Sequence, residues 1–314
     1  MKRLSLKACC AAAIACCAAL PAHAQSNVTI YGRLNLSLER QKLNNGDSLS
    51  VLQNNASRIG FKGTEDLGDG MFAGFQLEHG FSADTGAQTQ TSFWARQSEV
   101  HLGSKRAGML RLGNFTSEAY YATADYVSMH NHDTGTSSDA FYAYIGRNGN
   151  KVAYRTPDMG GFTAEAAVTA GEGAGERTYD LAVNGTVGPV QLGAGYEKNG
   201  DANQFAVRAL YEIGAFVVGG YVQRDENAYG AGKRTTTRLA GMYNLGSTEL
   251  HLNWGHAGKY SDVAGDSSAN QYTLGVNHNL SKRTKVYGFY TKVTDKGTIY
   301  GDFSSIALGL RHNF

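Results

Sequence analysis

Apolar and polar residues alternate one by one through much of this 314-residue chain. In VTIYGRLNLSL (28–38), every second residue from Val28 is Val, Ile or Leu, with Gly32 as the one exception. The alternation returns in YDLAVNGTV (179–187), VQLGAGYE (190–197), NQFAVRALY (203–211), ELHLNWGH (249–256) and QYTLGVNHNL (271–280). A period of two predicts β-strands with one apolar and one polar face. Each run is about ten residues long, which is the length a tilted strand needs to cross a bilayer.

The connections between these runs distinguish a membrane barrel from a β-sandwich, because alternation alone fits both. Very short turns such as DMGG, VGPV and LSKR alternate with longer polar segments. The longer segments are 39–56, 82–91, 115–148, 171–177, 198–203, 225–234, 257–270 and 296–303. This alternation predicts an all-β fold, a transmembrane antiparallel up-and-down β-barrel of about 16 strands with both termini on the short-turn side.

The final residues, SSIALGLRHNF (304–314), continue the strand pattern up to Phe314. An open sheet edge in lipid would leave backbone N–H and C=O groups unpaired, at a cost of several kcal/mol each. We therefore expect the last strand to pair with the first, near Val28 to Leu38, and to close the barrel. Because about 16 strands enclose an aqueous lumen, polar side chains should face water inside and apolar ones lipid outside.

One connection, 115–148, is far longer than a hairpin loop and contains five tyrosines. Long loops in compact domains are usually functional. We expect this loop, the third long one, to fold into the lumen and narrow the pore.

The first 24 residues differ from the rest of the chain. A basic start, MKRLSLK, precedes an apolar run too short to span a bilayer as a helix, and PAHA follows. This pattern predicts a secretory signal peptide over 1–24 and a single outer-membrane barrel domain over 25–314. All four cysteines lie in 1–24, so the exported domain would use no disulfide. The chain carries 29 Lys and Arg against 27 Asp and Glu, a balance that gives no reason to expect a nucleic-acid partner.

Six stretches also carry a family resemblance. They are VTIYGRLNLSL, SRIGFKGTEDLGDGMFAGFQLE, LRLGNF, NKVAYRTPDMGGF, HNLSKRTKVYGFYTKV and LGLRHNF. Together they are similar to the general diffusion porins of Gram-negative bacteria, in particular the trimeric porins of beta-proteobacteria such as Neisseria and Burkholderia. The resemblance implies a homotrimer among the lipid and lipopolysaccharide of the outer membrane, through which ions and small hydrophilic solutes diffuse passively. Phe314 resembles the terminal residue that the barrel-insertion machinery reads.

Candidate pore residues come from strand parity and from the family resemblance. Strand parity places Arg33 and Arg58 on the lumen side, because a charge facing lipid at mid-bilayer costs ~2–4 kcal/mol. The resemblance assigns Arg58, Arg96 and Arg147 to a basic cluster at the constriction. Arg96, however, shares the parity of the lipid-facing Val100, and a β-bulge between these two residues would reconcile the two criteria.

The 115–148 loop supplies the acidic partners, Glu118 and Asp125, of which Asp125 matches an acidic position of the family. Opposed to the wall arginines, they would set a field across the pore, and rings of charge govern ion selectivity. The excess of arginines favours anions. Where relatives often carry charged or amide residues at the loop entrance, this chain has Asn114 and Phe115, which removes one possible charge.

Two other functions are weighed against the channel: an outer-membrane barrel enzyme, either a protease or a phospholipase, and a plugged structural or adhesive barrel. An enzyme needs a nucleophile or carboxylate pair beside a histidine, and no convincing Ser/His/Asp set is found. His130 and His132 are weak indications of a metal site. We therefore expect no catalysis, cofactor or metal.

Overall fold

The computed structural model describes residues 27–125, 127, 140–173 and 176–314. The expected signal peptide, 1–24, lies outside these residues. The strands are β1 (Asn27–Lys42), β2 (Ser48–Asn54), β3 (Arg58–Gly68), β4 (Met71–Gly80), β5 (Gln97–Ser104), β6 (Gly108–Asn114), β7 (Lys151–Arg155), β8 (Phe162–Thr169), β9 (Thr178–Val187), β10 (Val190–Asn199), β11 (Ala202–Ile213), β12 (Phe216–Glu226), β13 (Lys233–Leu245), β14 (Thr248–Ala257), β15 (Ala269–Asn279), β16 (Thr284–Asp295) and β17 (Phe303–Asn313). Between β6 and β7 lie α2 (Glu118–Tyr120) and the π-helical turn η1 (Tyr121–Asp125). No helix in the described part of the chain is long and apolar enough to cross a membrane.

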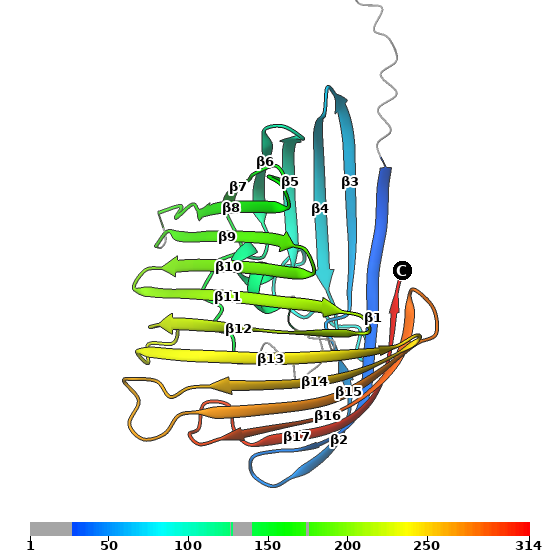
Figure 1. Cartoon of the computed structure of the whole chain (residues 1–314), viewed down its shortest axis with the longest axis vertical. Coiled ribbons are helices and arrows are strands. Elements are labelled where there is room, and N and C mark those ends of the chain that lie inside the picture. The colour runs from blue at the N-terminus through cyan, green and yellow to red at the C-terminus, as the bar shows by residue number, and fades with distance from the viewer. Residues whose placement is uncertain (1–26, 126, 128–139, 174–175) are drawn as a thin grey trace, which may run out of the picture.

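The antiparallel sheet closes on itself because β17 pairs with β1 (Figure 1). The register runs from Arg33 opposite Asn313 to Lys42 opposite Ser304. β2 and β3 both pair with β1, so they are two halves of one strand, and the 17 strands make a barrel of 16. The predicted closure is confirmed, although it involves the C-terminal part of β1 rather than the part near Val28.

The barrel is apolar outside and polar inside, the reverse of a water-soluble domain. The most exposed large hydrophobic residues include Leu308 (73%) and Leu38 (68%). Gln204, Gln223 and Gln271, which have the opposite parity on their strands, are fully buried. The alternation read from the sequence therefore has lipid on one side and the barrel interior on the other.

A bulge where β2 passes into β3 sets the facing of the residues after it. Asn54 lies opposite Leu36 and Arg58 lies opposite Arg33, so three residues of one strand face two of the other. Ala56, within this bulge, has φ of 54°, a left-handed conformation that residues with a Cβ rarely adopt. Because one extra residue exchanges the two faces of a strand, the bulge turns the side chain of Arg58 inward.

Two of the predicted long loops are wrong. In place of loop 39–56, β1 continues to Lys42 and β2 begins at Ser48, which leaves a short hairpin. In place of loop 198–203, β10 ends at Asn199 and β11 begins at Ala202. Region 198–203 contains no large apolar residue, and in 39–56 the apolar Leu49, Val51 and Leu52 do not alternate regularly with polar residues. The strand pattern is therefore lost in both regions although the backbone pairing continues.

The second half of the described 115–148 segment packs against the inner face of β11 to β13. The Ala143 N–H donates to Gln223 Oε1 (2.7 Å), and Gln223 Nε2 donates back to the Ala143 carbonyl (2.9 Å). Gln204 Nε2 donates to the Tyr142 hydroxyl (3.0 Å), and Arg234 donates to the Phe141 carbonyl (3.0 Å). These bonds attach the segment to buried side chains of β11, β12 and β13.

The first half of the segment is held on β9 by α2. The Ser117 hydroxyl caps α2 by accepting from the N–H groups of Ala119 and Tyr120. Asp180 of β9 accepts from the Glu118 and Ala119 N–H groups, both at 3.2 Å. A carboxylate is favoured at this position because the first N–H groups of a helical turn have no internal partner.

Replacing Leu308 with arginine should destabilise the barrel by ~2–4 kcal/mol, because the charge would face lipid near the middle of a strand. The measurement is guanidinium unfolding in phospholipid vesicles. Leu280→Arg, in the turn after β15, is the matched control and should cost only ~0–1 kcal/mol near the interface. Equal costs for the two variants would contradict a lipid-facing Leu308.

Replacing Gln223 with alanine should loosen the segment without opening the barrel. Two buried hydrogen bonds to the segment are lost, each worth ~0.5–1.5 kcal/mol, so hydrogen exchange at the Ala143 amide should accelerate by roughly 10- to 100-fold. Gln191→Ala removes a bond to Glu212 on β11 and is the control. An unchanged exchange rate at Ala143 would show that Gln223 does not hold the segment.

Candidate functional site

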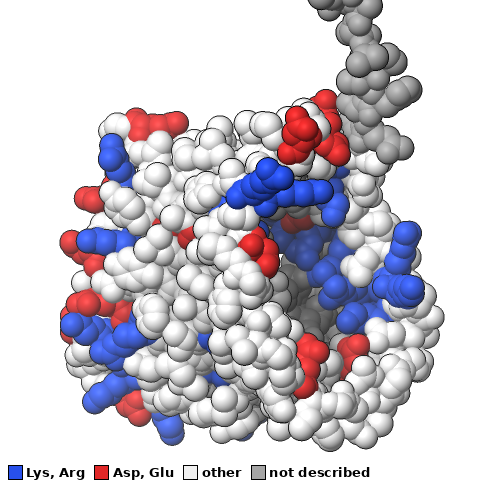
Figure 2. All heavy atoms as spheres, turned by 45° about the horizontal axis from the view of Figure 1, so that its top comes forward, with Lys and Arg blue, Asp and Glu red and all other residues white. Residues whose placement is uncertain are grey.

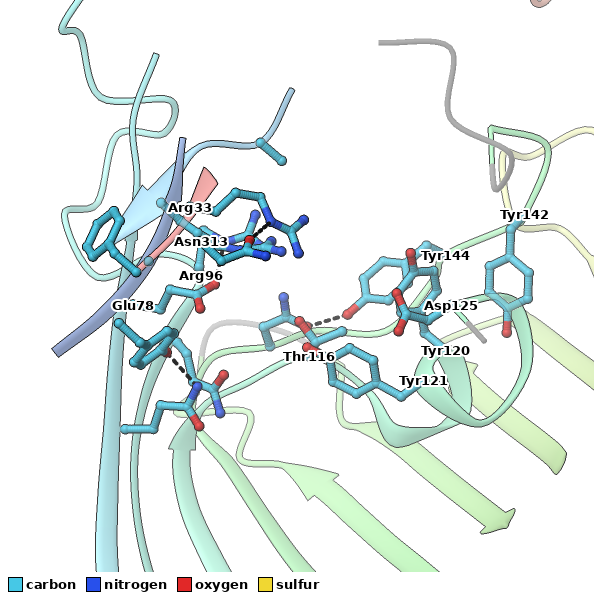
Figure 3. Close-up of a pocket in the computed structure, with 18 residues that line it drawn as sticks. Arg33, Glu78, Arg96, Thr116, Tyr120, Tyr121, Asp125, Tyr142, Tyr144 and Asn313 are labelled. Atoms are coloured by element: carbon cyan, nitrogen blue, oxygen red, sulfur yellow. Dashed lines mark hydrogen bonds and ion pairs between the residues drawn. The ribbon is translucent and has the colours of Figure 1, made fainter. Parts of the chain in front are cut away.

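A cavity of about 920 Å³ lies between the wall formed by β1, β3 and β4 and the anchored 115–148 segment (Figure 3). Four of the six predicted pore residues line it: Arg33, Arg58, Arg96 and Asp125. The lining also includes Tyr31, Gly32, Ala56, Gln76, Glu78, Gln97, Thr116, Tyr120, Tyr121, Tyr142, Tyr144, Asn148, Asn313 and Phe314. The two remaining predicted residues, Glu118 and Arg147, are not part of the described lining.

The basic side of the cavity is built by neighbouring strands. Arg33 of β1 lies directly opposite Arg58 of β3 in the ladder. Arg33 Nε and Arg311 Nε both donate to Asn313 Oδ1, at 3.2 and 3.3 Å, and Arg311 lies opposite Lys285 of β16. Like charges directly opposite each other destabilise a sheet. This cationic strip across β3, β1, β17 and β16 therefore opposes folding, which indicates a role other than stability.

Arg96 reaches the cavity without a bulge in its strand. The register of β4 with β5 is continuous from Gln97 to Ser104, so the bulge expected between Arg96 and Val100 is wrong. Arg96 instead lies in the bend just before β5, where strand parity does not apply. Its Nε donates to Glu78 Oε1 at 2.5 Å.

The loop entrance residues Asn114 and Phe115 help to hold the backbone near Arg96 and the wall near Arg111 in place. Asn114 Nδ2 donates to the carbonyls of Trp94 and Ala95, at 3.2 and 3.0 Å, and so holds the backbone just before Arg96. The Phe115 ring is buried and lies 4.1 Å from the Arg111 guanidinium. These two uncharged residues therefore position the entrance rather than add to its charge.

The opposite side of the cavity is acidic at one point and otherwise aromatic. Figure 3 shows Asp125, Tyr120, Tyr121, Tyr142 and Tyr144 across the cavity from Arg33 and Arg96. Burial raises the pKa values of the Tyr121 and Tyr144 hydroxyls, so these side chains remain neutral at physiological pH. Asp125 is thus the negative charge on the described part of this side.

Glu118 and Arg147 take other positions. Glu118 pairs with Arg155 of β7, and Asn184 Nδ2 donates to its second carboxylate oxygen at 3.1 Å. It therefore ties α2 to the wall. Arg147 is exposed where the segment approaches β7, outside the described lining of the cavity.

Charges on the wall behind the segment are paired with one another. Arg111 pairs with Glu99 at 2.7 Å and with Glu165 at 3.0 Å, and Arg155 Nε donates to Glu165 at 2.8 Å. Basic side chains instead gather on the wall of the hollow that remains open, as Figure 2 shows. One wall of the barrel thus carries these ion pairs, and basic side chains gather on another wall.

Sequence reasoning missed Glu78, the partner of Arg96, and the contribution of Asn313. Glu78 shares the lumen parity of Gln76 in β4, so its facing could be read from the pattern. Its pairing could not, because Arg96 lies outside the strand. Within the described residues, no group of three or more His, Cys, Asp or Glu could hold a metal ion. His130 and His132 lie outside the described residues.

Comparisons with known proteins agree with this architecture. A family model described as "Gram-negative porin" matches residues 10–298. The outer membrane porin protein 32 of Delftia acidovorans is 32% identical over 304 residues, covering 85% of this chain and 84% of that protein. The major outer membrane protein P.IB of Neisseria meningitidis is 26% identical and covers 95% of this chain and 97% of its own length.

A solved structure, the anion-selective porin from Comamonas acidovorans, superposes with a TM-score of 0.79 and 26% identity. It covers 92% of this chain and 100% of that chain. These relatives are channels and not enzymes, which decides against the protease and phospholipase alternatives. The chain belongs to the Gram-negative porin family and is an outer-membrane β-barrel that serves as a passive diffusion channel.

Proposed function

We propose that this porin prefers anions and that the cavity between the basic strip and the 115–148 segment is its constriction. The observation that carries the proposal is the charge on the two sides of the cavity. Arg33, Arg58 and Arg96 line one side, whereas Asp125 is the acid on the described part of the other. Arginines therefore outnumber acidic side chains in this lining even with Glu78 beside Arg96, and a positive lining attracts anions.

The separation of charge across the cavity has a second consequence. A solute that passes between Arg58 and Asp125 would experience a field across its path rather than along it. Such a field orients dipolar solutes and lets water-soluble molecules exchange their hydration for contacts with both sides. The likeness to the anion-selective porin from Comamonas acidovorans supports the sign of the preference.

The assembly and biogenesis expected from the family belong to the same proposal. We infer a homotrimer, with lipopolysaccharide around the barrel rim and with the strand that ends at Phe314 read by the barrel-insertion machinery. Conductance steps in multiples of three would support the trimer. A plugged structural barrel would give no steps.

Asp125→Asn should raise the chloride-to-potassium permeability ratio, and Arg58→Gln should lower it. One charge a few ångströms from a hydrated ion is worth ~1 kcal/mol, so each change should be roughly 2- to 5-fold. The measurement is the reversal potential across a planar bilayer in a potassium chloride gradient.

Arg106→Gln is the matched control, since Arg106 is exposed in the short turn between β5 and β6, away from the cavity. Its reversal potential should equal that of the wild type. The proposal fails if Arg58→Gln and Asp125→Asn also leave the wild-type value unchanged, or if the wild type prefers potassium.

A further inference from the structure

The side of the constriction that faces the arginines is rich in aromatic side chains. Passage of small inorganic ions does not require such side chains. Five of the residues lining the cavity are tyrosines: Tyr31, Tyr120, Tyr121, Tyr142 and Tyr144. The rings of the loop tyrosines contact one another, with centroids of Tyr120 and Tyr121 5.8 Å apart and of Tyr120 and Tyr144 5.6 Å apart. The site therefore offers a cationic side and an aromatic side to a single solute.

We propose that the constriction favours aromatic carboxylates, of the benzoate class, over aliphatic carboxylates of the same size and charge. This inference rests on the proposed function, because it requires the cavity to be the path of anions. The carboxylate would pair with Arg33 and Arg58, whose guanidinium groups can each donate two parallel hydrogen bonds. The ring would lie against Tyr120 and Tyr121.

The geometry brings the two kinds of group close enough for one solute. Tyr121 lines the same cavity as Arg58 and lies across it from Arg96 (Figure 3). Tyr120 and Tyr121 are only partly buried, so part of each ring is open to the cavity. Tyr142 is buried behind them and is fixed by Gln204 and by Thr123, whose hydroxyl lies 2.9 Å from its own.

The preference for an aromatic ring has an electrostatic cause. The edge of an aromatic ring is positive and its face is negative, so it gains from edge-to-face contact with tyrosine rings. The same negative face attracts a guanidinium group. A saturated ring of the same carbon skeleton has no such quadrupole and gains only from burial of its surface.

The test compares benzoate with cyclohexanecarboxylate as blockers of chloride current through the full protein in planar bilayers. We expect the apparent dissociation constant of benzoate to be lower by about 2- to 10-fold, the range for one aromatic pair. In Tyr121→Leu the ratio of the two constants should fall toward one. In Tyr121→Phe, which keeps the aromatic ring, the ratio should stay at its wild-type value.

Tyr272→Leu is the matched control, because Tyr272 faces lipid on β15 and its loss should not change the ratio. Equal constants for the two acids in the wild type would overturn the inference without needing any variant to fold. An unchanged ratio in Tyr121→Leu would do so as well. If the proposed function itself were wrong, the wild type would instead prefer potassium over chloride in the absence of either acid.

Discussion

The structure depends on one constraint: in lipid, every backbone N–H and C=O must be paired within the protein. Pairing of β17 with β1 satisfies it by removing the free edges of the sheet. Once the sheet is closed, each strand has one face toward lipid and one toward the interior, and a side chain's position along its strand decides its surroundings. The exposed Leu308 and the buried Gln271 lie on nearby strands of the same sheet for this reason.

A closed barrel with a polar interior must also satisfy the charges inside it. On the wall that carries the 115–148 segment, Arg111, Arg155 and Glu165 neutralise one another, and the segment docks through Gln223 and Asp180. On the remaining wall, Arg33 and Arg58 face each other, an arrangement that costs stability. The position of the segment thus determines which charges a passing solute meets.

Much of the fold can be predicted: parity indicates the strands, the alternating connections indicate the antiparallel order, and the cost of unpaired backbone in lipid indicates the closure. Parity also puts Arg33 and Arg58 on the face of their strands that lines the cavity. The bulge at Ala56 was not predicted, because nothing in its residue types demands a positive φ. Arg96 was ambiguous for a physical reason: it lies outside β5, where successive side chains no longer alternate. The pairing of Glu118 with Arg155 depends on where α2 docks, and this is set by contacts between residues distant in sequence.

The central claim is that residues of opposite parity on one strand have different surroundings, lipid on one face and the water-filled interior on the other. Single cysteines at Asn313 and Leu308 of β17 test it most directly, because all four native cysteines lie in residues 1–24. In lipid vesicles, a charged, membrane-impermeant maleimide should react with a cysteine at 313 and reduce the conductance, and it should react at 308 only after unfolding. Rapid labelling of a cysteine at 308 in the intact barrel, with protection at 313, would contradict the account.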